Sequence, residues 1–502
     1  MILGDTNDIV GSGPTLDDLF RRVGVRHPEA LALVDPPNRT SFAGDVPRQL
    51  TFAQADRAIS ALAVRLRGLG LATDSVVAIQ LANTVESVIG LMGVLRAGMI
   101  AAPLPLLWRQ QDIAAALSPI GAKAIITAAR IGDTALAEVA MQAAAEVFPI
   151  RYVCGFGDAL PDGTVTLDDI FAAGGAEFTP TPRAELAAAH VAVISFETGV
   201  DGITAVARNP IQLIAGGLAV FLETGMAEDA PLLSTIPLSS FAGFAVTLMP
   251  WLLGGGTLHL QHGFDSHTFA AQSKTLGLGT AILPGPMLPP LHDAGLLGEL
   301  KSIVALWRAS ERLATAPPWR GEASLIDVAC FGETGLVASP RRADGAPCGI
   351  RHGVIAAGRE KAGSIPVIET ARTSAGTLAL RGAMVPAQPF PPGSEERTDK
   401  EGFIDTNLPC RHERITDTLT VTGPVPGLIG VGGYRFGVQA LEMLVAESDP
   451  AATLIALPDA LTGERLAGGA GDPAALRATL DARGVNPLVS GAFRPRKTLE
   501  AA

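Results

Sequence analysis

The stretch LTFAQADRAISALAVRLRGLGLATDSVVAIQLANTVESVIGLMGVLRAGMIAAPLPL, residues 50–106, decides the fold. Its first part carries apolar residues at helical spacing and stops at Gly68 and Gly70, which predicts a helix. A short apolar run follows, then a second helical segment that ends at Gly98, then another apolar run. This strand–helix–strand order predicts a parallel sheet with right-handed crossovers.

The alternation of apolar runs and helical segments continues to about residue 340. Runs at residues 122–128 and 190–196 have the length and composition of buried strands, and residues 325–338 are interpreted as a strand followed by a turn. After about Gly376 the pattern changes, because GTLALRG is typical of a strand in a sheet of a different type. A Pro/Gly cluster at residues 423–427 is the preferred candidate for a linker, and a small α/β unit is expected after it.

The composition excludes several classes of protein. A chain of 502 residues exceeds one hydrophobic core, so two or more domains are expected. The net charge of −12 argues against binding to nucleic acid or to anionic lipid. Four widely spaced cysteines and an N-terminal segment without a signal-peptide pattern favour a cytoplasmic protein. Prolines and glycines interrupt the uncharged run at residues 230–264, so no transmembrane segment is expected.

Three segments, taken in order, resemble the superfamily of adenylate-forming enzymes, which includes acyl-CoA ligases, adenylation domains of peptide synthetases and luciferases. Residues 50–106 are similar to the N-terminal stretch of the family. IPLSSFAGFAVTLMPWLLGGGTLHLQHGFD, residues 236–265, is similar to its middle stretch. ALPDALTGERLAG, residues 456–468, is similar to part of its C-terminal domain. Within the superfamily the chain looks like an AMP-dependent acyl-CoA synthetase.

The resemblance implies an α/β fold class with a large and a small domain. The expected parts are a large N-terminal domain (1–422) with two stacked α/β subdomains (about 1–189 and 190–340) and a small β-barrel-like subdomain (341–422), then a hinge (423–427) and a small, mobile, truncated α/β C-terminal domain (428–502).

The resemblance also implies a reaction. Members of the family activate a carboxylate with ATP to an acyl-adenylate, and they usually transfer the acyl group to a thiol. ATP with Mg²⁺ and CoA are therefore the expected cofactors, and a small carboxylate or an acyl-CoA is the expected partner. A homodimer or a complex with a partner protein stays open.

SFETGVDGITAVARN, residues 195–209, lies where the resemblance places the phosphate-binding loop. The residues that match the loop, and are expected to bind the nucleotide, are Thr198, Gly199 and Gly202. Two acids, Glu197 and Asp201, stand where the family has hydroxyl groups, and Ala205 falls near the position of its lysine. Coulomb repulsion opposes ATP here unless a metal or Arg208 compensates. The alternative interpretation is a strand-to-helix turn that is kept for folding.

A second motif of the family, an aromatic residue followed by a Gly-x-Thr-Glu turn, is similar to CFGETGLVA. The matching residues are Phe331, Gly332, Glu333 and Thr334. The resemblance implies that Phe331 and Gly332 contact the nucleotide, that Glu333 and Thr334 are catalytic and that Glu333 binds Mg²⁺. A surface glutamate in a turn is the alternative. Before this motif, Trp307 and Arg308 are bulky where the family leaves room for the purine.

The remaining motifs are altered. Asn407 stands where the family has the aspartate that binds ribose, so it could accept only one uncharged hydrogen bond. Pro424 replaces the arginine of the hinge, and Lys497 lies outside the context of the family's late lysine. Ser240 and Phe241 fall at the expected acyl pocket.

These alterations leave two hypotheses open. The first is an acid–thiol ligase with weak or atypical use of ATP. The second is a non-catalytic relative that binds an acyl or CoA compound or a partner protein. A thioester-handling enzyme that does not use ATP is a further alternative. HLQHGFDSH at residues 259–267 could ligate zinc, but solvated histidines at a strand end are more common.

Overall fold

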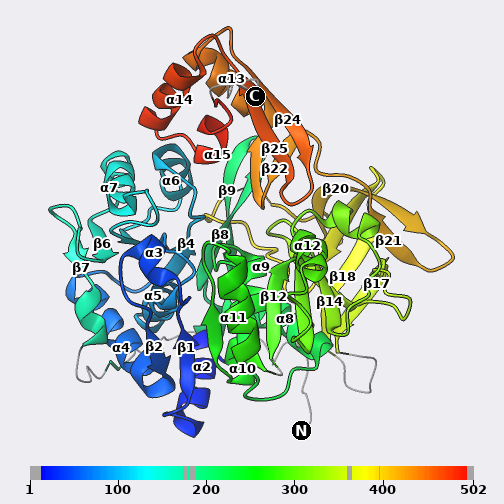
Figure 1. Cartoon of the computed structure of the whole chain (residues 1–502), viewed down its shortest axis with the longest axis horizontal. Coiled ribbons are helices and arrows are strands. Elements are labelled where there is room, and N and C mark those ends of the chain that lie inside the picture. Colours follow the sequence, from blue (N-terminus) through cyan, green and yellow to red (C-terminus); the bar gives the residue numbers. More distant parts are fainter. Residues whose placement is uncertain are drawn as a thin grey trace, which may run out of the picture.

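The computed structural model describes residues 13–172, 178–179, 187–277, 279–358, 365–394 and 396–494. Within these residues the strands form four sheets, two of which are largely parallel and belong to the large domain (Figure 1). The seven-stranded sheet has the order β7-β6-β5-β3-β4-β8-β9. Its strands are β3 (Val76–Ile79), β4 (Ile100–Pro103), β5 (Ala124–Ala128), β6 (Tyr152–Phe156), β7 (Val165–Thr166), β8 (Val193–Gly199) and β9 (Gly202–Arg208).

The eight-stranded sheet has the order β15-β14-β13-β12-β10-β11-β1-β2. Its strands are β1 (Leu31–Val34), β2 (Gln49–Thr51), β10 (Leu232–Ser234), β11 (Leu258–Leu260), β12 (Thr280–Pro284), β13 (Ser302–Trp307), β14 (Ser324–Phe331) and β15 (Gly335–Pro340). The two sheets therefore do not divide at residue 189. The N-terminal strands β1 and β2 join the second sheet, whereas β8 and β9 extend the first through the parallel pair Ala101 and Val193.

Helices pack against both sheets. They are α2 (Leu16–Arg26), α3 (Arg39–Ala43), α4 (Phe52–Gly68), α5 (Val85–Arg96), α6 (Gln110–Leu117), α7 (Leu136–Glu146), α8 (Pro210–Thr224), α9 (Phe241–Gly243), α10 (Met249–Gly254), α11 (Ser266–Leu276) and α12 (Leu288–Asp293). Residues 50–106 fold as their sequence pattern predicts. Thr51 and Gln54 form a capping box at the start of α4, and the helix ends beside Gly70.

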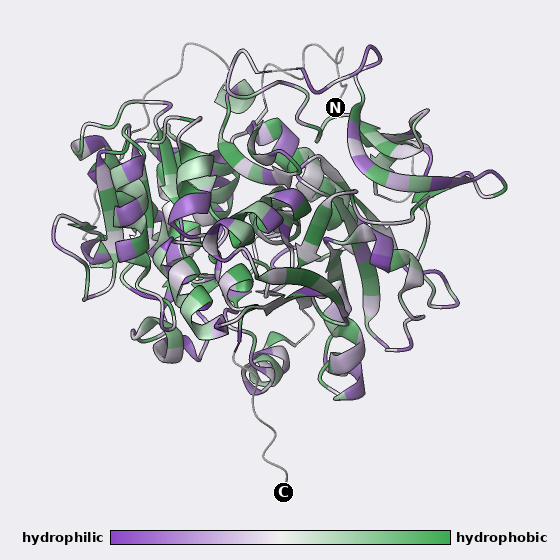
Figure 2. Ribbon diagram, turned by 90° about the horizontal axis from the view of Figure 1, so that it is seen from above, coloured by the Kyte–Doolittle hydropathy of each residue, from purple (hydrophilic) through white to green (hydrophobic). Residues whose placement is uncertain are grey.

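The faces of α4 and α5 explain how this stretch builds the core. The α4 positions at helical spacing are all fully buried: Ala55, Ile59, Leu62 and Leu66. Gly93 of α5 lies so close to Leu62 that a Cβ there would come within 2.6 Å of the leucine side chain. The glycine is thus required for the close packing of the two helices. Hydrophobic residues gather along the inner strands and helices, and hydrophilic residues mark outer faces and loops (Figure 2).

The six-stranded sheet has the order β16-β21-β20-β19-β18-β17, and all its neighbouring strands are antiparallel. Its strands are β16 (Ile350–Arg351), β17 (Gly353–Ala357), β18 (Ile365–Arg372), β19 (Thr377–Arg381), β20 (Ile404–Glu413) and β21 (Thr418–Val421). GTLALRG contains β19 and does belong to a sheet of a different type, but this sheet begins before Gly376, at β16.

The C-terminal unit has its own small core and lies above the large domain (Figure 1). It consists of β22 (Leu428–Val431), β23 (Tyr434–Gly437), α13 (Val438–Ser448), β24 (Thr453–Asp459), β25 (Gly463–Gly469), α14 (Pro473–Ala482) and α15 (Pro487–Ser490). Among the helices of the described residues, none is both long and apolar enough to cross a membrane.

Candidate functional site

The glycine-rich segment is a tight β-hairpin. Strand β8 runs to Gly199, two residues turn, and β9 starts at Gly202, which pairs with Gly199. Gly202 has a φ of 117°, which a residue with a side chain rarely adopts. Because helix α8 begins only at Pro210, the structure differs from a strand-to-helix turn. Thr198, Gly199 and Gly202 all lie at the end of this hairpin.

The C-terminal domain packs directly on the hairpin. A Cβ at Gly427 would lie 3.1 Å from Val200 Cγ1, and one at Gly437 would lie 3.2 Å from the Val200 carbonyl oxygen. Tyr434 Oη accepts a hydrogen bond of 3.1 Å from the backbone N–H of Leu107 in the large domain. In this position of the two domains, the C-terminal domain contacts the hairpin turn, although Val200 at its tip stays 51% exposed.

The Glu197 carboxylate joins the large domain to the C-terminal domain at this site. It accepts a hydrogen bond from the backbone N–H of Glu333 and pairs with the Arg435 guanidinium of β23. A Cβ at Gly332 would collide with this carboxylate, so the glycine makes room for it. A backbone N–H and an arginine are the donors that usually hold an anionic ligand, and here they hold a side chain of the protein.

Glu333 is buried and paired with Arg208. The Glu333 carboxylate accepts a hydrogen bond of 2.8 Å from the Phe241 N–H and lies 3.9 Å from the Arg208 guanidinium. Arg208 also donates to the Glu333 carbonyl and lies 3.9 Å above the Phe241 ring. Burial raises the pKa of Glu333, and Arg208 opposes that shift. Burial lowers the pKa of Arg208 to about 10, so it stays charged at neutral pH.

The other expected nucleotide residues lie in different surroundings. Phe331 is 1% exposed and is part of the main core, and Thr334 donates its N–H to the Phe331 carbonyl over 3.1 Å. Asn407 is exposed on β20 with a φ of 56°, and its N–H donates to Asp405. Among the described residues, no hydrogen bond joins the Asn407 side chain to the group around Glu333. Lys497 lies outside the described residues.

Of the two bulky residues Trp307 and Arg308, only Arg308 contacts residues next to this group. Trp307 is buried against Gly285 and donates its indole N–H to Asp327 over 2.8 Å. Arg308 donates to the Ser240 hydroxyl over 2.7 Å and packs against Gly433 of the C-terminal domain. Arginines of the large and the small domain therefore converge on the expected site from two sides.

A cavity of about 230 Å³ opens next to the site. It lies past the carboxyl ends of β3, β4, β10 and β11, and Tyr434 reaches it from the C-terminal domain. Its wall contains Leu238 and Ser239 but neither Ser240 nor Phe241, which are buried next to it. The cavity is therefore lined by the two residues that directly precede Ser240 and Phe241, the expected acyl-pocket residues.

Two buried amides in the cavity wall each leave one oxygen without a partner among the described residues. Asn83 donates its NH₂ group to the Ser234 and Gln261 carbonyls, both over 3.1 Å, which leaves its Oδ1 unpaired. Gln261 donates its NH₂ group to Gln272 and its Oε1 is unpaired. Both oxygens are inaccessible to solvent, so they are buried acceptors behind the cavity surface and not contacts that the wall offers to a ligand.

The cavity wall is otherwise apolar or neutral. None of the residues that line it is Lys, Arg, Asp or Glu. Burial lowers the pKa of His262 to about 4, so its imidazole is neutral at pH 7. The volume lies below the roughly 300–1,000 Å³ of pockets for drug-sized ligands. The cavity therefore suits a small uncharged group better than a free carboxylate.

His262 makes the stability of the fold depend on pH. Its folded pKa of about 4 lies below the ordinary 6.5, so between these values the unfolded chain binds more protons. We expect the free energy of unfolding to fall as the pH drops through this window, by at most about 1.4 kcal/mol per pH unit from this residue. Urea unfolding of His262→Gln at pH 7 and 4.5 checks this, and an unchanged pH slope would contradict it.

The sequence indicates Arg208 as a cation that compensates the acids of the hairpin, but no motif in it indicates that Arg435 belongs to the site. The glutamate that Arg435 pairs with is 238 residues away in the chain. The histidine cluster at residues 259–267 is not assembled, because the His262 ring packs against Phe42 and Asp265 caps α11.

Comparison with known proteins gives a consistent family and fold. Residues 20–278 match the family described as AMP-binding enzyme. Long-chain fatty acid transport protein 1 of Mus musculus is 36% identical over 131 residues, which are 26% of this chain and 19% of that protein. The match thus spans about a fifth of the relative's length.

Solved structures match over nearly the whole chain. The amide bond synthetase McbA from Marinactinospora thermotolerans has a TM-score of 0.70 at 19% identity and covers 94% of both chains. The ATP-bound MatB from Rhodopseudomonas palustris has a TM-score of 0.62 at 17% identity, covering 94% of this chain and 92% of that one. At these identities the likeness establishes the fold, and the expected α/β fold class is confirmed.

Proposed function

The chain belongs to the family of AMP-binding enzymes, and on that premise we propose that it binds a small acyl compound while its ATP-dependent activation of carboxylates is weak or absent. The observation that carries the proposal is the position of Glu197. Its carboxylate occupies the backbone N–H of Glu333 and the guanidinium of Arg435, which are the donors an anionic ligand would need. The acyl group would lie in the neutral cavity beside Leu238 and Tyr434.

With its side chains in the positions described above, the site does not fit ATP with Mg²⁺. Glu197 and Asp201 would face phosphate oxygens, and the repulsion would be strong because the hairpin lacks a lysine. The Glu333 carboxylate is buried and already bonded to the Phe241 N–H, so it is not exposed to a hydrated metal ion. Charge stabilisation by such groups is worth about 3 kcal/mol for each strong donor in enzymes that use it.

A second candidate is an acid–thiol ligase that forms an acyl-CoA slowly. It is favoured by Arg208 and Glu333, a cation and a carboxylate that both remain at the site. In that candidate Glu333 and Thr334 would be catalytic and Glu333 would bind Mg²⁺. The nucleotide would be held by Thr198, Gly199, Gly202, Phe331, Gly332 and Asn407. This second candidate requires the ion pair between Arg208 and Glu333 to break. In either candidate a cytoplasmic location is part of the proposal.

Calorimetric titration with MgATP and pyrophosphate exchange over a panel of carboxylic acids separate the candidates. We expect no heat of ATP binding at millimolar concentration and no exchange above a blank. Clear exchange with any acid would overturn the non-catalytic proposal and support the ligase.

The cavity is tested by filling it. We expect short-chain acyl thioesters of cysteamine to raise the melting temperature of the wild type. Leu91 of α5 is 1% exposed and lines the cavity, so Leu91→Trp should remove that stabilisation. The extra volume should cost about 1–3 kcal/mol of stability. The matched control is Val64→Trp at an exposed position of α4, which should keep the stabilisation. Equal stabilisation of both variants would place the acyl group elsewhere.

A further inference from the structure

The register of three strands brings two histidines and an aspartate close together in the six-stranded sheet. Arg351 pairs with Thr418, so the next residue, His352, lies opposite Asp417. The backbone N–H of His352 donates a hydrogen bond of 3.0 Å to the Asp417 carbonyl. His412 of β20 pairs with Leu419, and Asp417 lies two residues before Leu419 in the turn that precedes β21, so His412 and Asp417 are diagonal neighbours. Directly paired and diagonal neighbours on one face lie within reach of long side chains.

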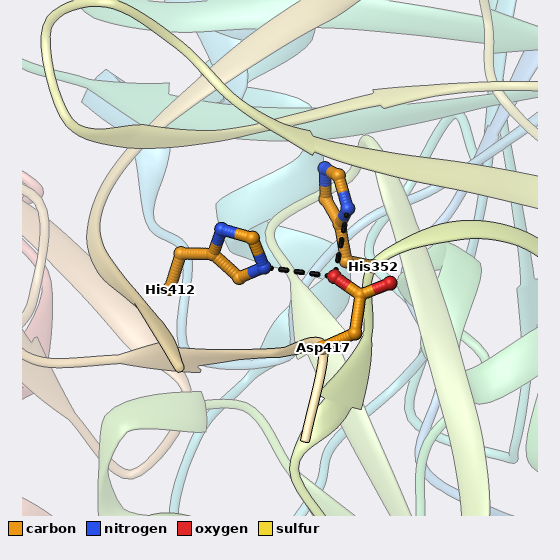
Figure 3. A group of neighbouring side chains, drawn as sticks. All are labelled: His352, His412 and Asp417. Carbon is orange, nitrogen blue, oxygen red and sulfur yellow. Dashed lines mark hydrogen bonds and ion pairs between the residues drawn. The ribbon is translucent and has the colours of Figure 1, made fainter. Parts of the chain in front are cut away.

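The three side chains converge on one oxygen atom. Asp417 Oδ1 lies 3.2 Å from His352 Nδ1 and 2.9 Å from His412 Nε2, and the two ring centroids are 4.7 Å apart (Figure 3). Among the described residues, this is the one group in which three His, Cys, Asp or Glu ligand atoms lie within 4.8 Å of one another. No part of the candidate active site or of its cavity includes these residues.

We propose that His352, His412 and Asp417 form a binding site for a divalent first-row transition metal, with Zn²⁺ as the reference ion. With bonds of about 2.0–2.2 Å, each of the two nitrogen–metal–oxygen angles would be roughly 90–105° at the observed nitrogen–oxygen separations, which a zinc site accommodates. Imidazole and carboxylate ligands suit zinc, and their combined charge of −1 offsets part of the ion's charge. Each ligand keeps its outer side open, since the exposed fractions are 37%, 29% and 66%, so water can complete the coordination.

A metal ion at this site would stabilise the six-stranded sheet by cross-linking it. Its ligands come from the segment after β16, from β20 and from the turn before β21, so a bound ion would join three neighbouring stretches of one sheet. None of the three residues lines the cavity beside Leu238 and Tyr434, so a substrate bound there would not contact the ion.

Titration of the EDTA-treated full chain with ZnCl₂ tests the proposal. We expect one ion per chain with micromolar affinity and a rise in the melting temperature of a few degrees that EDTA reverses. Asp417→Asn and His412→Ala should each weaken binding by at least tenfold. Because all three side chains are partly exposed, these variants should melt in EDTA as the wild type does, which shows that they fold.

The matched control is His267→Ala, an exposed histidine on α11 that should bind zinc as the wild type does. Retention of wild-type affinity in Asp417→Asn and His412→Ala would overturn the site. So would the absence of any saturable zinc binding by the wild type, which would leave the group as two histidines that donate hydrogen bonds to one carboxylate.

Discussion

Replacing Arg208 with methionine is expected to lower the free energy of unfolding by about 3–5 kcal/mol. The Arg208 side chain is 1% exposed and that of Glu333 is 7% exposed, so methionine would leave a buried carboxylate without its cation. The variant would also lose the donor to the Glu333 carbonyl and the cation over the Phe241 ring. Urea unfolding at pH 7, followed by the fluorescence of the buried tryptophans, measures the loss.

Three comparisons show whether the loss comes from the charge. The double variant Arg208→Met with Glu333→Gln should recover most of the stability, because no charge then stays buried alone. Burial already raises the pKa of Glu333, and loss of the arginine raises it further, so the folded variant takes up a proton as the pH falls. Its deficit should therefore shrink between pH 7 and pH 5. Arg308→Met, at a half-buried arginine, should cost less than about 1 kcal/mol.

A small, pH-independent loss of unfolding free energy in Arg208→Met would have a direct consequence for function. It would mean that Glu333 does not need its cation and is free to serve as a metal ligand, as the ligase candidate requires. A large deficit would instead identify the pair as part of the structure that holds the turn after β14 against β8 and β9.

The sequence was sufficient for the elements that local patterns determine. The stop at Gly68 and Gly70 and the buried spacing from Ala55 to Leu66 depend on contiguous residues, so the pattern contains what is needed. The same holds for the turn that joins β14 to β15, where Phe331 pairs with Gly335.

The parts that could not be predicted depend on contacts between distant residues. The pairing of Glu197 with Arg435 joins two domains, and nothing near Arg435 in the chain indicates its partner. The cavity was expected at Ser240 and Phe241, yet the Phe241 ring is packed against Gly216 and Arg208, so the open space lies beside Leu238 and Ser239. Side-chain packing decides which of several adjacent residues faces an empty volume, and periodicity does not contain that information.

Rebuilding the charge of the hairpin is expected to create ATP binding. In the triple variant Glu197→Thr, Asp201→Ser, Thr204→Lys, two acids are removed and one cation is added. Loss of the Glu197 carboxylate also frees the Glu333 N–H and the Arg435 guanidinium for phosphate oxygens. The Coulomb terms of these changes act on a highly charged ligand, so we expect MgATP to bind on the order of 100-fold more tightly than to the wild type. Calorimetry at two salt concentrations measures the gain and its screening.

The position of the new lysine provides a sharp control. Thr204 pairs with Glu197 across the hairpin and therefore shares its face, whereas Ala205 pairs with Phe196 and faces the opposite side, where Phe196 packs against Trp108. Ala205→Lys, combined with the same two acid replacements, adds an identical charge on the wrong face and should gain at least tenfold less affinity. Equal gain from both lysines would mean that the hairpin rearranges when ATP binds. If neither variant binds ATP at millimolar concentration, repulsion from Glu197 and Asp201 is not what excludes the nucleotide, and the bulk of Trp307 and Arg308 becomes the cause to test.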